Sequence, residues 1–278
     1  MKKDIYLIGD VGHFNNHTLN IFNTINQDSL PDDCIILLGD NFYPYGIENE
    51  NDHRIENLKF LGNEKIPIYP VLGNHDYLGN PFSQLNINLK NWNFERFFYK
   101  KTFLNCDVFF IDSVILQPNY SSTSENLMKI KIKDYEKIRN DMILWLKNEL
   151  EKSNNTKIVV GHYPLISLGV YGMNKDLFEI LINLFEKTNV RLYVSGHDHN
   201  LQICNITNYK SGYSLKHIVS GSGSDLYEQS RFFKLQKEGS IFFKNGFVRL
   251  SLDERSNEII ITFIDEDGNI LATDSIKN

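Results

Sequence analysis

The chain has 278 residues, of which 41% are hydrophobic and 23% are charged, and 29 basic and 35 acidic side chains give a formal net charge of -6. A chain of this size and composition buries a core without disulfides, and we expect one domain over residues 1–278. The acidic balance excludes the basic footprint of a nucleic-acid-binding protein. Three widely spaced cysteines, Cys34, Cys106 and Cys204, allow at most one disulfide and no thiolate metal cage.

Short apolar runs bounded by turns are typical of buried strands. The expected strands, in chain order, are Ile5–Ile8, Ile35–Leu38, Ile66–Leu72, Val108–Ile111, Ile158–Val160, Val190–Val194 and Ile218–Val219. Apolar residues recur at helical spacing in Asn140–Lys152 and Lys175–Glu186, and strands that alternate with helices predict an α/β fold. From Ile241 to Ile276 we expect antiparallel hairpins, with turns at Lys244–Gly246 and Glu266–Asn269.

Five of these strands lead into a glycine followed by a polar side chain. A single Gly-Asp pair is usually only a turn, but ligands in open α/β sheets gather outside the carboxyl ends of strands, where five such turns converge. Carboxylate, amide and imidazole groups suit borderline and hard metal ions, and an aspartate can bridge two ions. The pattern predicts a dinuclear metal site from Gly9-Asp10, Gly39-Asp40, Gly73-Asn74-His75-Asp76, Gly161-His162 and Gly196-His197-Asp198-His199.

These motifs resemble those of the purple acid phosphatases, within the calcineurin-like metallophosphoesterases. The similarity is strongest to the small, single-domain, tartrate-resistant type and extends over nearly the whole chain. It implies a four-layer α/β/β/α sandwich with the dinuclear site at the strand ends. Many metallophosphoesterases carry Asp-x-His in the first motif, whereas here Gly12 stands at the position of that histidine, and the resemblance implies that Tyr43 supplies the missing ligand. The resemblance is carried by Gly9-Asp10-Val11-Gly12, Gly39-Asp40-Asn41-Phe42-Tyr43, Gly73-Asn74-His75, Val159-Val160-Gly161-His162 and Gly196-His197-Asp198-His199.

The resemblance also implies a role for each matched residue. A metal-bound hydroxide would attack the phosphorus, His75 would be the general acid or a phosphate donor, and Asp76 would orient the His75 imidazole. Asn74, His75 and Tyr171 would contact the substrate, although relatives carry a histidine where this chain has Tyr171, which cannot carry positive charge. Asp10, Tyr43 and His199 would hold Fe(III), Asn74, His162 and His197 would hold Fe(II), Zn(II) or Mn(II), and Asp40 would bridge the two ions.

The function implied is that of an acid phosphatase, which hydrolyses phosphate monoesters with broad specificity. The substrates would be small phosphorylated molecules, with phosphoproteins and nucleotides left open. A metallophosphodiesterase for nucleotides or related esters is a second interpretation, and a catalytically silent binding or scaffold protein of the same fold is a third. We expect a monomer without nucleic-acid or membrane partners. The first apolar run is too short for a signal peptide, so the expectation is a cytoplasmic protein if the chain is complete, and a secreted or lysosome-like one if a leader was removed.

Several other features predict no separate site. His13, His17, His53 and His217 lack ligand spacing to one another. The acidic run Asp265–Gly268 lacks the full ligand pattern of a calcium loop, and a hairpin turn explains it. Gly221–Ser224 lacks the third glycine of a dinucleotide fingerprint and is expected to line the same crevice as the five motifs.

Overall fold

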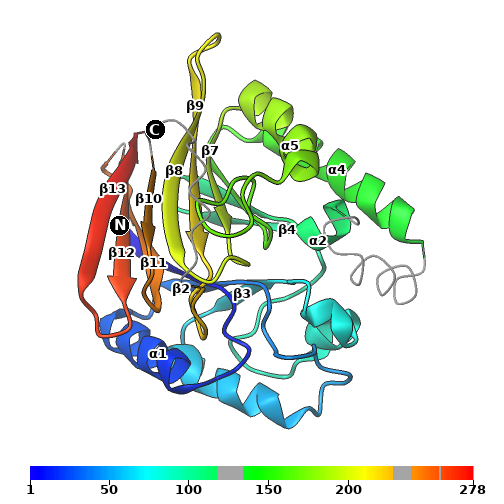
Figure 1. The fold of residues 1–278 in the computed structure, drawn as a ribbon, viewed down its shortest axis with the longest axis vertical. Coiled ribbons are helices and arrows are strands. Elements are labelled where there is room, and N and C mark those ends of the chain that lie inside the picture. Colours follow the sequence, from blue (N-terminus) through cyan, green and yellow to red (C-terminus); the bar gives the residue numbers. More distant parts are fainter. Residues whose placement is uncertain (118–133, 228–238, 257, 278) are drawn as a thin grey trace.

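Two β-sheets pack against each other between helices in the structure, a computed structural model that describes residues 1–117, 134–227, 239–256 and 258–277 (Figure 1). Helix α1 (Asn16–Asp28) lies beside the first sheet, and α4 (Tyr135–Lys152) and α5 (Lys175–Thr188) lie beside the second. Shorter helical segments are η1 (His53–Glu64), η2 (Asp76–Leu78), η3 (Pro81–Asn86) and α2 (Ser113–Leu116). The predicted α/β fold with four layers is confirmed.

Each strand belongs to one of the two sheets. In spatial order the first sheet contains β13 (Ile270–Lys277), β12 (Glu258–Asp265), β11 (Gly246–Asp253), β1 (Lys2–Ile8), β2 (Cys34–Leu38) and β3 (Ile68–Val71). The second sheet contains β10 (Gly239–Phe242), β8 (Leu201–Asn208), β9 (Tyr213–Ser220), β7 (Val190–Ser195), β6 (Thr156–Val160), β5 (Cys106–Phe110) and β4 (Tyr99–Phe103).

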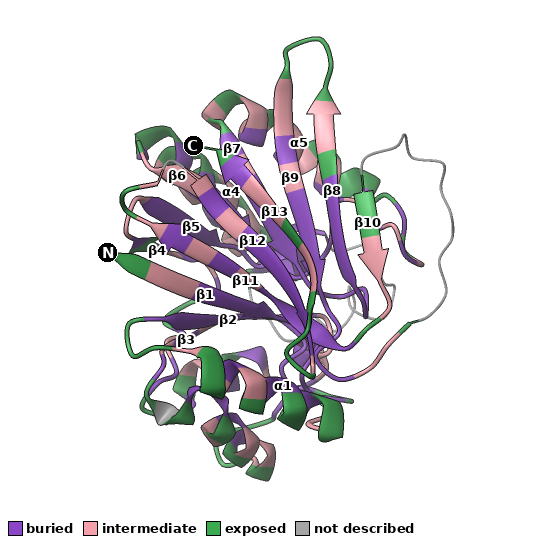
Figure 2. Ribbon diagram, turned by 90° about the vertical axis from the view of Figure 1, so that its left-hand side faces the viewer, coloured by how far each residue is buried: buried purple, intermediate pink, exposed green. Residues whose placement is uncertain are grey.

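The central strands of both sheets are parallel and buried on both faces. Strands β1, β2 and β3 run parallel in the first sheet, as do β5, β6, β7 and β9 in the second. Every residue of β2 and β5 is buried, and exposed residues gather on the helices and in the loops (Figure 2). Burial on both faces explains the unbroken apolar runs of the sequence. Because parallel strands end at the same edge, the loops that follow them lie together.

The C-terminal region departs from its prediction at one turn. Strand β10 pairs with β8 in the second sheet, whereas β11 pairs with β1 and β12 in the first. The predicted hairpin turn at Lys244–Gly246 is therefore wrong, because the chain changes sheets there. The Asn245 amide donates to the carbonyls of Ser222 (3.0 Å) and Ser224 (3.1 Å), which ties this segment to the loop after β9.

The second predicted turn does join β12 to β13 as a hairpin. The Asp265 carboxylate accepts a hydrogen bond from the backbone N–H of Asn269 at 2.8 Å, so the acidic run at Asp265–Gly268 has a turn role, as expected. Strands β11, β12 and β13 thus form the predicted antiparallel region.

Two further expectations concern buried groups. The three cysteines are buried and free. His217 on β9 is buried, stacks on Tyr193 at 5.3 Å between ring centroids, and has Nε2 3.3 Å from Ser195 Oγ, which indicates a structural role. Burial lowers the pKa of His217 to about 3, so its ring is neutral.

Among the described residues, no helix has both the length and the apolar character of a membrane span.

Candidate metal centre

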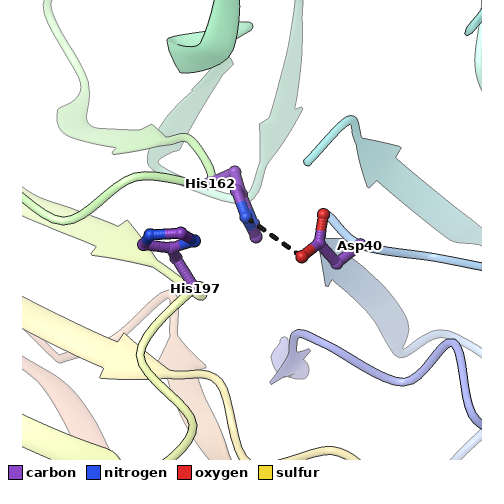
Figure 3. Close-up of side chains that lie close together, drawn as sticks. All are labelled: Asp40, His162 and His197. Carbon is purple, nitrogen blue, oxygen red and sulfur yellow. Dashed lines mark ion pairs between the residues drawn. The ribbon is translucent and has the colours of Figure 1, made fainter. Parts of the chain in front are cut away.

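All seven side chains predicted to bind metal lie in loops that follow the carboxyl ends of parallel strands. The first sheet supplies four of them and the second sheet supplies three, so the candidate centre lies where the two sets of loops meet. In Figure 3, Asp40 from the first sheet faces His162 and His197 from the second, and their ligand atoms lie within 4.8 Å of one another. Asp10 follows β1, Asp40 and Tyr43 follow β2, Asn74 follows β3, His162 follows β6, and His197 and His199 follow β7.

Tyr43 brings three potential ligands together on one side of the centre. Its hydroxyl lies 3.0 Å from Asp10 Oδ1, 3.0 Å from Asp40 Oδ2 and 3.1 Å from His199 Nε2. A phenol has one proton, so it can donate in only one of these contacts. A cation among the four groups would satisfy the remaining lone pairs, and the donor set of carboxylates, phenol and imidazole fits a hard or borderline metal ion.

His162 points a lone pair at the other side of the centre. Its Nδ1 lies 2.8 Å from the Leu38 carbonyl oxygen, which can only accept, so Nδ1 carries the proton. In the neutral ring Nε2 is then an acceptor, and it lies 3.1 Å from Asn74 Oδ1 and 3.6 Å from Asp40 Oδ2. Three acceptors that face one another also fit a bound cation.

The electrostatics of the two sides differ. Burial raises the pKa of Tyr43 well above its usual value, and the carboxylates of Asp10 and Asp40 raise it further, so the phenol keeps its proton unless a cation binds. Burial lowers the pKa of His197 well below its usual value, and the neighbouring histidines add to this shift. A neutral imidazole is the form that binds metal. Burial opposes protonation of His199, but Asp10 and Asp40 still raise its pKa.

Three of the seven candidate ligands have strained backbones. Asp10, Asp40 and His197 have φ values of 60°, 52° and 69°, in the left-handed region that residues other than glycine rarely adopt. Each such residue costs on the order of 1–3 kcal/mol and persists only where its surroundings enforce it. The backbone N–H of His197 donates to Asp10 Oδ2 at 2.8 Å, and that of Asp10 donates to the Gly39 carbonyl at 3.0 Å. Strain concentrated on candidate ligands is typical of a functional site.

Gly12 explains how a tyrosine reaches the centre. A Cβ atom on Gly12 would lie 2.5 Å from the backbone nitrogen of Tyr43, which is closer than non-bonded atoms approach. The same two residues are joined by a hydrogen bond from the Tyr43 N–H to the Gly12 carbonyl at 3.1 Å. The absence of a side chain at Gly12 therefore lets the loop after β2 pack against the loop after β1 and bring in the Tyr43 ring.

His75 is held by a backbone carbonyl. Its Nδ1 lies 2.8 Å from the Pro44 carbonyl oxygen, and its ring meets the edge of the Tyr43 ring at 4.6 Å between centroids. The expectation that Asp76 orients the His75 imidazole is therefore wrong. The reason is local geometry, because Asp76 begins the short helix η2 and its carboxylate points inward.

Asp76 instead joins two of the ligand loops. Its buried carboxylate accepts hydrogen bonds from the backbone N–H groups of Gly73 (2.8 Å) and Asn41 (3.1 Å) and from the Gln84 amide (2.7 Å). Burial, together with the nearby Asp40 carboxylate, raises the pKa of Asp76 to about 7. Asp76 is thus a positioning residue that ties the loop carrying Asp40 to the loop carrying Asn74.

Two aromatic residues near the centre were not predicted as site residues. The His13 ring lies 4.7 Å from the Tyr43 ring, and His13 Nε2 is 3.6 Å from Asp225 Oδ2. Tyr227 stacks on His199 with ring centroids 4.2 Å apart. Tyr227 follows the segment Gly221–Ser224, which lines the centre as expected, with Ser224 Oγ 2.5 Å from the Asp10 carbonyl oxygen. That glycine- and serine-rich segment was the one available signal for Tyr227.

Comparison with known proteins identifies the family. A family profile described as calcineurin-like phosphoesterase matches residues 3–201. The chain belongs to this family. It is similar to human tartrate-resistant acid phosphatase type 5, with 29% identity over 260 residues that cover 86% of this chain and 77% of that protein. It is also similar to purple acid phosphatase 7 of Arabidopsis thaliana, with 29% identity over 288 residues that cover 98% and 85%. The predicted resemblance is confirmed.

Two solved structures share the fold of this phosphoesterase. An anchor protein of the inner membrane complex of Plasmodium has a TM-score of 0.81 and 24% identity, covering 99% of this chain and 89% of that chain. A purple acid phosphatase from yellow lupin (Lupinus luteus) seeds has a TM-score of 0.71 and 19% identity, covering 100% of this chain and 54% of that chain. At these identities the two structures establish the fold alone. The family and the acid phosphatase relatives identify a metallophosphoesterase, a hydrolase that works with metal ions.

Proposed function

We propose that this metallophosphoesterase is an acid phosphatase that hydrolyses phosphate monoesters with a ferric ion and a divalent ion. The arrangement of Tyr43 supports this proposal most strongly, because its hydroxyl lies within hydrogen-bonding distance of Asp10, Asp40 and His199. A phenolate is a hard anionic donor that suits Fe(III). The similarity to tartrate-resistant and purple acid phosphatases supports the same assignment.

Seven residues would hold the two ions. Two carboxylates and a phenolate would leave a ferric and divalent pair with an excess of positive charge, which favours a phosphate dianion in spite of the acidic chain. When bound, the ions would lower the pKa of coordinated water and stabilise charge on the phosphoryl oxygens. The ferric ion would be held by Asp10, Tyr43 and His199. The divalent ion, which would be Fe(II), Zn(II) or Mn(II), would be held by Asn74, His162 and His197. Asp40 would hold both ions.

His75 would supply the proton that the leaving group needs. In the cationic ring, Nδ1 donates to the Pro44 carbonyl, and the proton on Nε2 remains available for the leaving oxygen. After transfer the ring is neutral and still held through Nδ1. General acid catalysis of this kind requires a positioned donor, which the Pro44 contact provides.

A second candidate function is a catalytically silent binding or scaffold protein. A shared fold does not fix function, and the Plasmodium protein with this fold is described as an anchor. The filled set of seven candidate ligands favours an enzyme. A substrate panel separates these functions: release of p-nitrophenol from its phosphate monoester is expected, release from the diester alone would favour a phosphodiesterase, and no release from metal-loaded protein would favour the scaffold.

The Tyr43→Phe variant tests the ferric site by colour. We expect iron-loaded wild type to show a visible phenolate-to-iron band, and Tyr43→Phe to lose it, because phenylalanine keeps the ring packing against His13 and His75 but has no donor oxygen. Absorption spectra of both proteins at matched iron content measure the effect. Tyr45→Phe is the matched control, since Tyr45 is exposed nearby and should leave the band unchanged. The same band in Tyr43→Phe would show that Tyr43 is not the iron ligand.

A further inference from the structure

Two tyrosine rings cover two of the histidines in the candidate centre. The Tyr171 ring lies over the His197 ring, with centroids 4.2 Å apart and planes inclined by 34°. The Tyr227 ring lies over the His199 ring at the same centroid distance, with planes inclined by 4°. Each tyrosine therefore packs one face against an imidazole that we assign to a metal ion.

The two tyrosines are open to solvent where the histidines are not. Tyr171 is 36% exposed and Tyr227 is 40% exposed, whereas His197 and His199 are 8% and 6% exposed. Aromatic surface is thus available directly outside the buried imidazoles. Each ring therefore touches both solvent and a candidate metal ligand.

The loops that carry these rings are tied to the loop after β7. The backbone N–H of Tyr227 donates to the His199 carbonyl at 2.9 Å. The loop of Tyr171 is closed by a hydrogen bond from the Ser167 N–H to the Gly172 carbonyl at 2.8 Å, and the Ser167 hydroxyl donates to the Asp198 carboxylate. Asp198 lies between the two histidines in the sequence, so both rings are held relative to the same short segment.

We propose that Tyr171 and Tyr227 form an aromatic rim that binds the organic group of an aryl phosphate, such as phenyl phosphate or phosphotyrosine. The proposal rests on the proposed function for the position of the phosphate. With the phosphate at the two ions, the organic group of the ester points outward and meets the tyrosine rings. A substrate arene attached directly to the ester oxygen offers a flat face that can stack on this rim, whereas an alkyl chain gains less.

The size of the expected preference follows from the strength of aromatic contacts. An aromatic pair adds about 0.5–1.5 kcal/mol beyond the area it buries, which corresponds to roughly two- to tenfold in affinity for each ring. The rim is distinct from the general acid, because it acts on binding of the organic group. It should therefore appear in the dissociation constant or KM rather than in kcat.

Binding of two phosphonates tests the rim without turnover. Phenylphosphonate and methylphosphonate share the anionic group and are not hydrolysed, so calorimetry on the metal-loaded protein measures the contribution of the arene alone. We expect wild type to bind phenylphosphonate more tightly, and Tyr171→Leu and Tyr227→Leu each to reduce that preference by roughly two- to tenfold while methylphosphonate binding stays within about twofold. Tyr171→Phe and Tyr227→Phe should retain the preference.

The control separates a substrate rim from a role in packing. Tyr209→Leu changes a tyrosine that is 76% exposed at the turn between β8 and β9, and it should leave both dissociation constants unchanged. Equal affinity of wild type for the two phosphonates, or an equal loss for both in the leucine variants, would overturn the rim and leave the tyrosines as supports of the histidines. Failure to bind phenylphosphonate at all would also overturn it.

The outcome is separable from that of the proposed function. If monoesters are hydrolysed and the two phosphonates bind alike, the rim is wrong and the acid phosphatase assignment stands. If no ester is hydrolysed and phenylphosphonate is still preferred through Tyr171 and Tyr227, the assignment is wrong and the rim stands.

Discussion

Replacement of Asp40 by alanine is expected to lower phosphomonoester turnover by about 10³-fold and to reduce the bound metal. Asp40 is the one candidate ligand that faces both sides of the centre, with Oδ2 3.0 Å from the Tyr43 hydroxyl and 3.6 Å from His162 Nε2. Asp40 Oδ1 also accepts a hydrogen bond from the backbone N–H of His75 at 2.8 Å. Metal ions stabilise a phosphoryl transition state by several kcal/mol, and each ~1.4 kcal/mol is tenfold in rate.

The measurement is turnover together with metal content per chain, in variants that keep the wild-type circular dichroism. Asn74→Ala should also lower both turnover and metal content, because it removes a ligand of one of the two ions. Asp274→Ala is the matched control, because that carboxylate lies on β13 beside Lys216 and outside the centre, and it should retain metal and activity. Stoichiometric metal and full turnover in Asp40→Ala would contradict the bridging role.

Replacement of His75 by alanine is expected to lower kcat by roughly 10²- to 10⁴-fold for alkyl phosphates, the range of general acid catalysis. The effect should be smaller for p-nitrophenyl phosphate, because nitrophenolate is a good leaving group and departs without a proton. Steady-state kinetics on both esters measures the difference. The metal content should stay at the wild-type level, since the structure gives His75 a contact with the Pro44 carbonyl through Nδ1 and no ligand position is assigned to it.

His17→Ala is the matched histidine control for this experiment. His17 is on the surface of α1, paired with Glu266 at 2.8 Å, and its loss should leave both activities unchanged. An equal fall on alkyl and nitrophenyl esters in His75→Ala would contradict the acid role and leave His75 as a phosphate-binding group.

The central sheets and their polar turns were predictable because their signals are local. Residues buried on both faces of a parallel strand are mostly apolar, so Ile35–Leu38 and Val108–Ile111 stand out as unbroken runs. A glycine and a polar residue at the end of such a strand mark the ligand-binding edge. Asp10, Asp40 and His162 could therefore be found from the sequence alone. Helix α1 was not predicted, since only Thr18, Ile21, Phe22 and Ile25 of its 13 residues are buried and its remaining residues are mostly polar.

Features that depend on contacts distant in sequence were not predictable. The Pro44 carbonyl is 31 residues from His75, and nothing in the sequence indicates that it, rather than the adjacent Asp76, holds the imidazole. The pairing of β10 with β8 depends on the position of a strand formed earlier in the chain. Tyr227 reaches His199 only because the loop after β9 returns to the centre.

The most direct test of the dinuclear centre is a titration of metal-free protein with Fe(III) and Zn(II). Phosphate release from p-nitrophenyl phosphate and bound metal per chain would be measured at each addition. We expect activity to be absent after chelation, because the candidate ligands alone supply no nucleophile, and to reach its maximum when about two ions are bound per chain, one of them iron. Full activity in the chelated protein, or a maximum at one ion per chain, would contradict a dinuclear phosphatase.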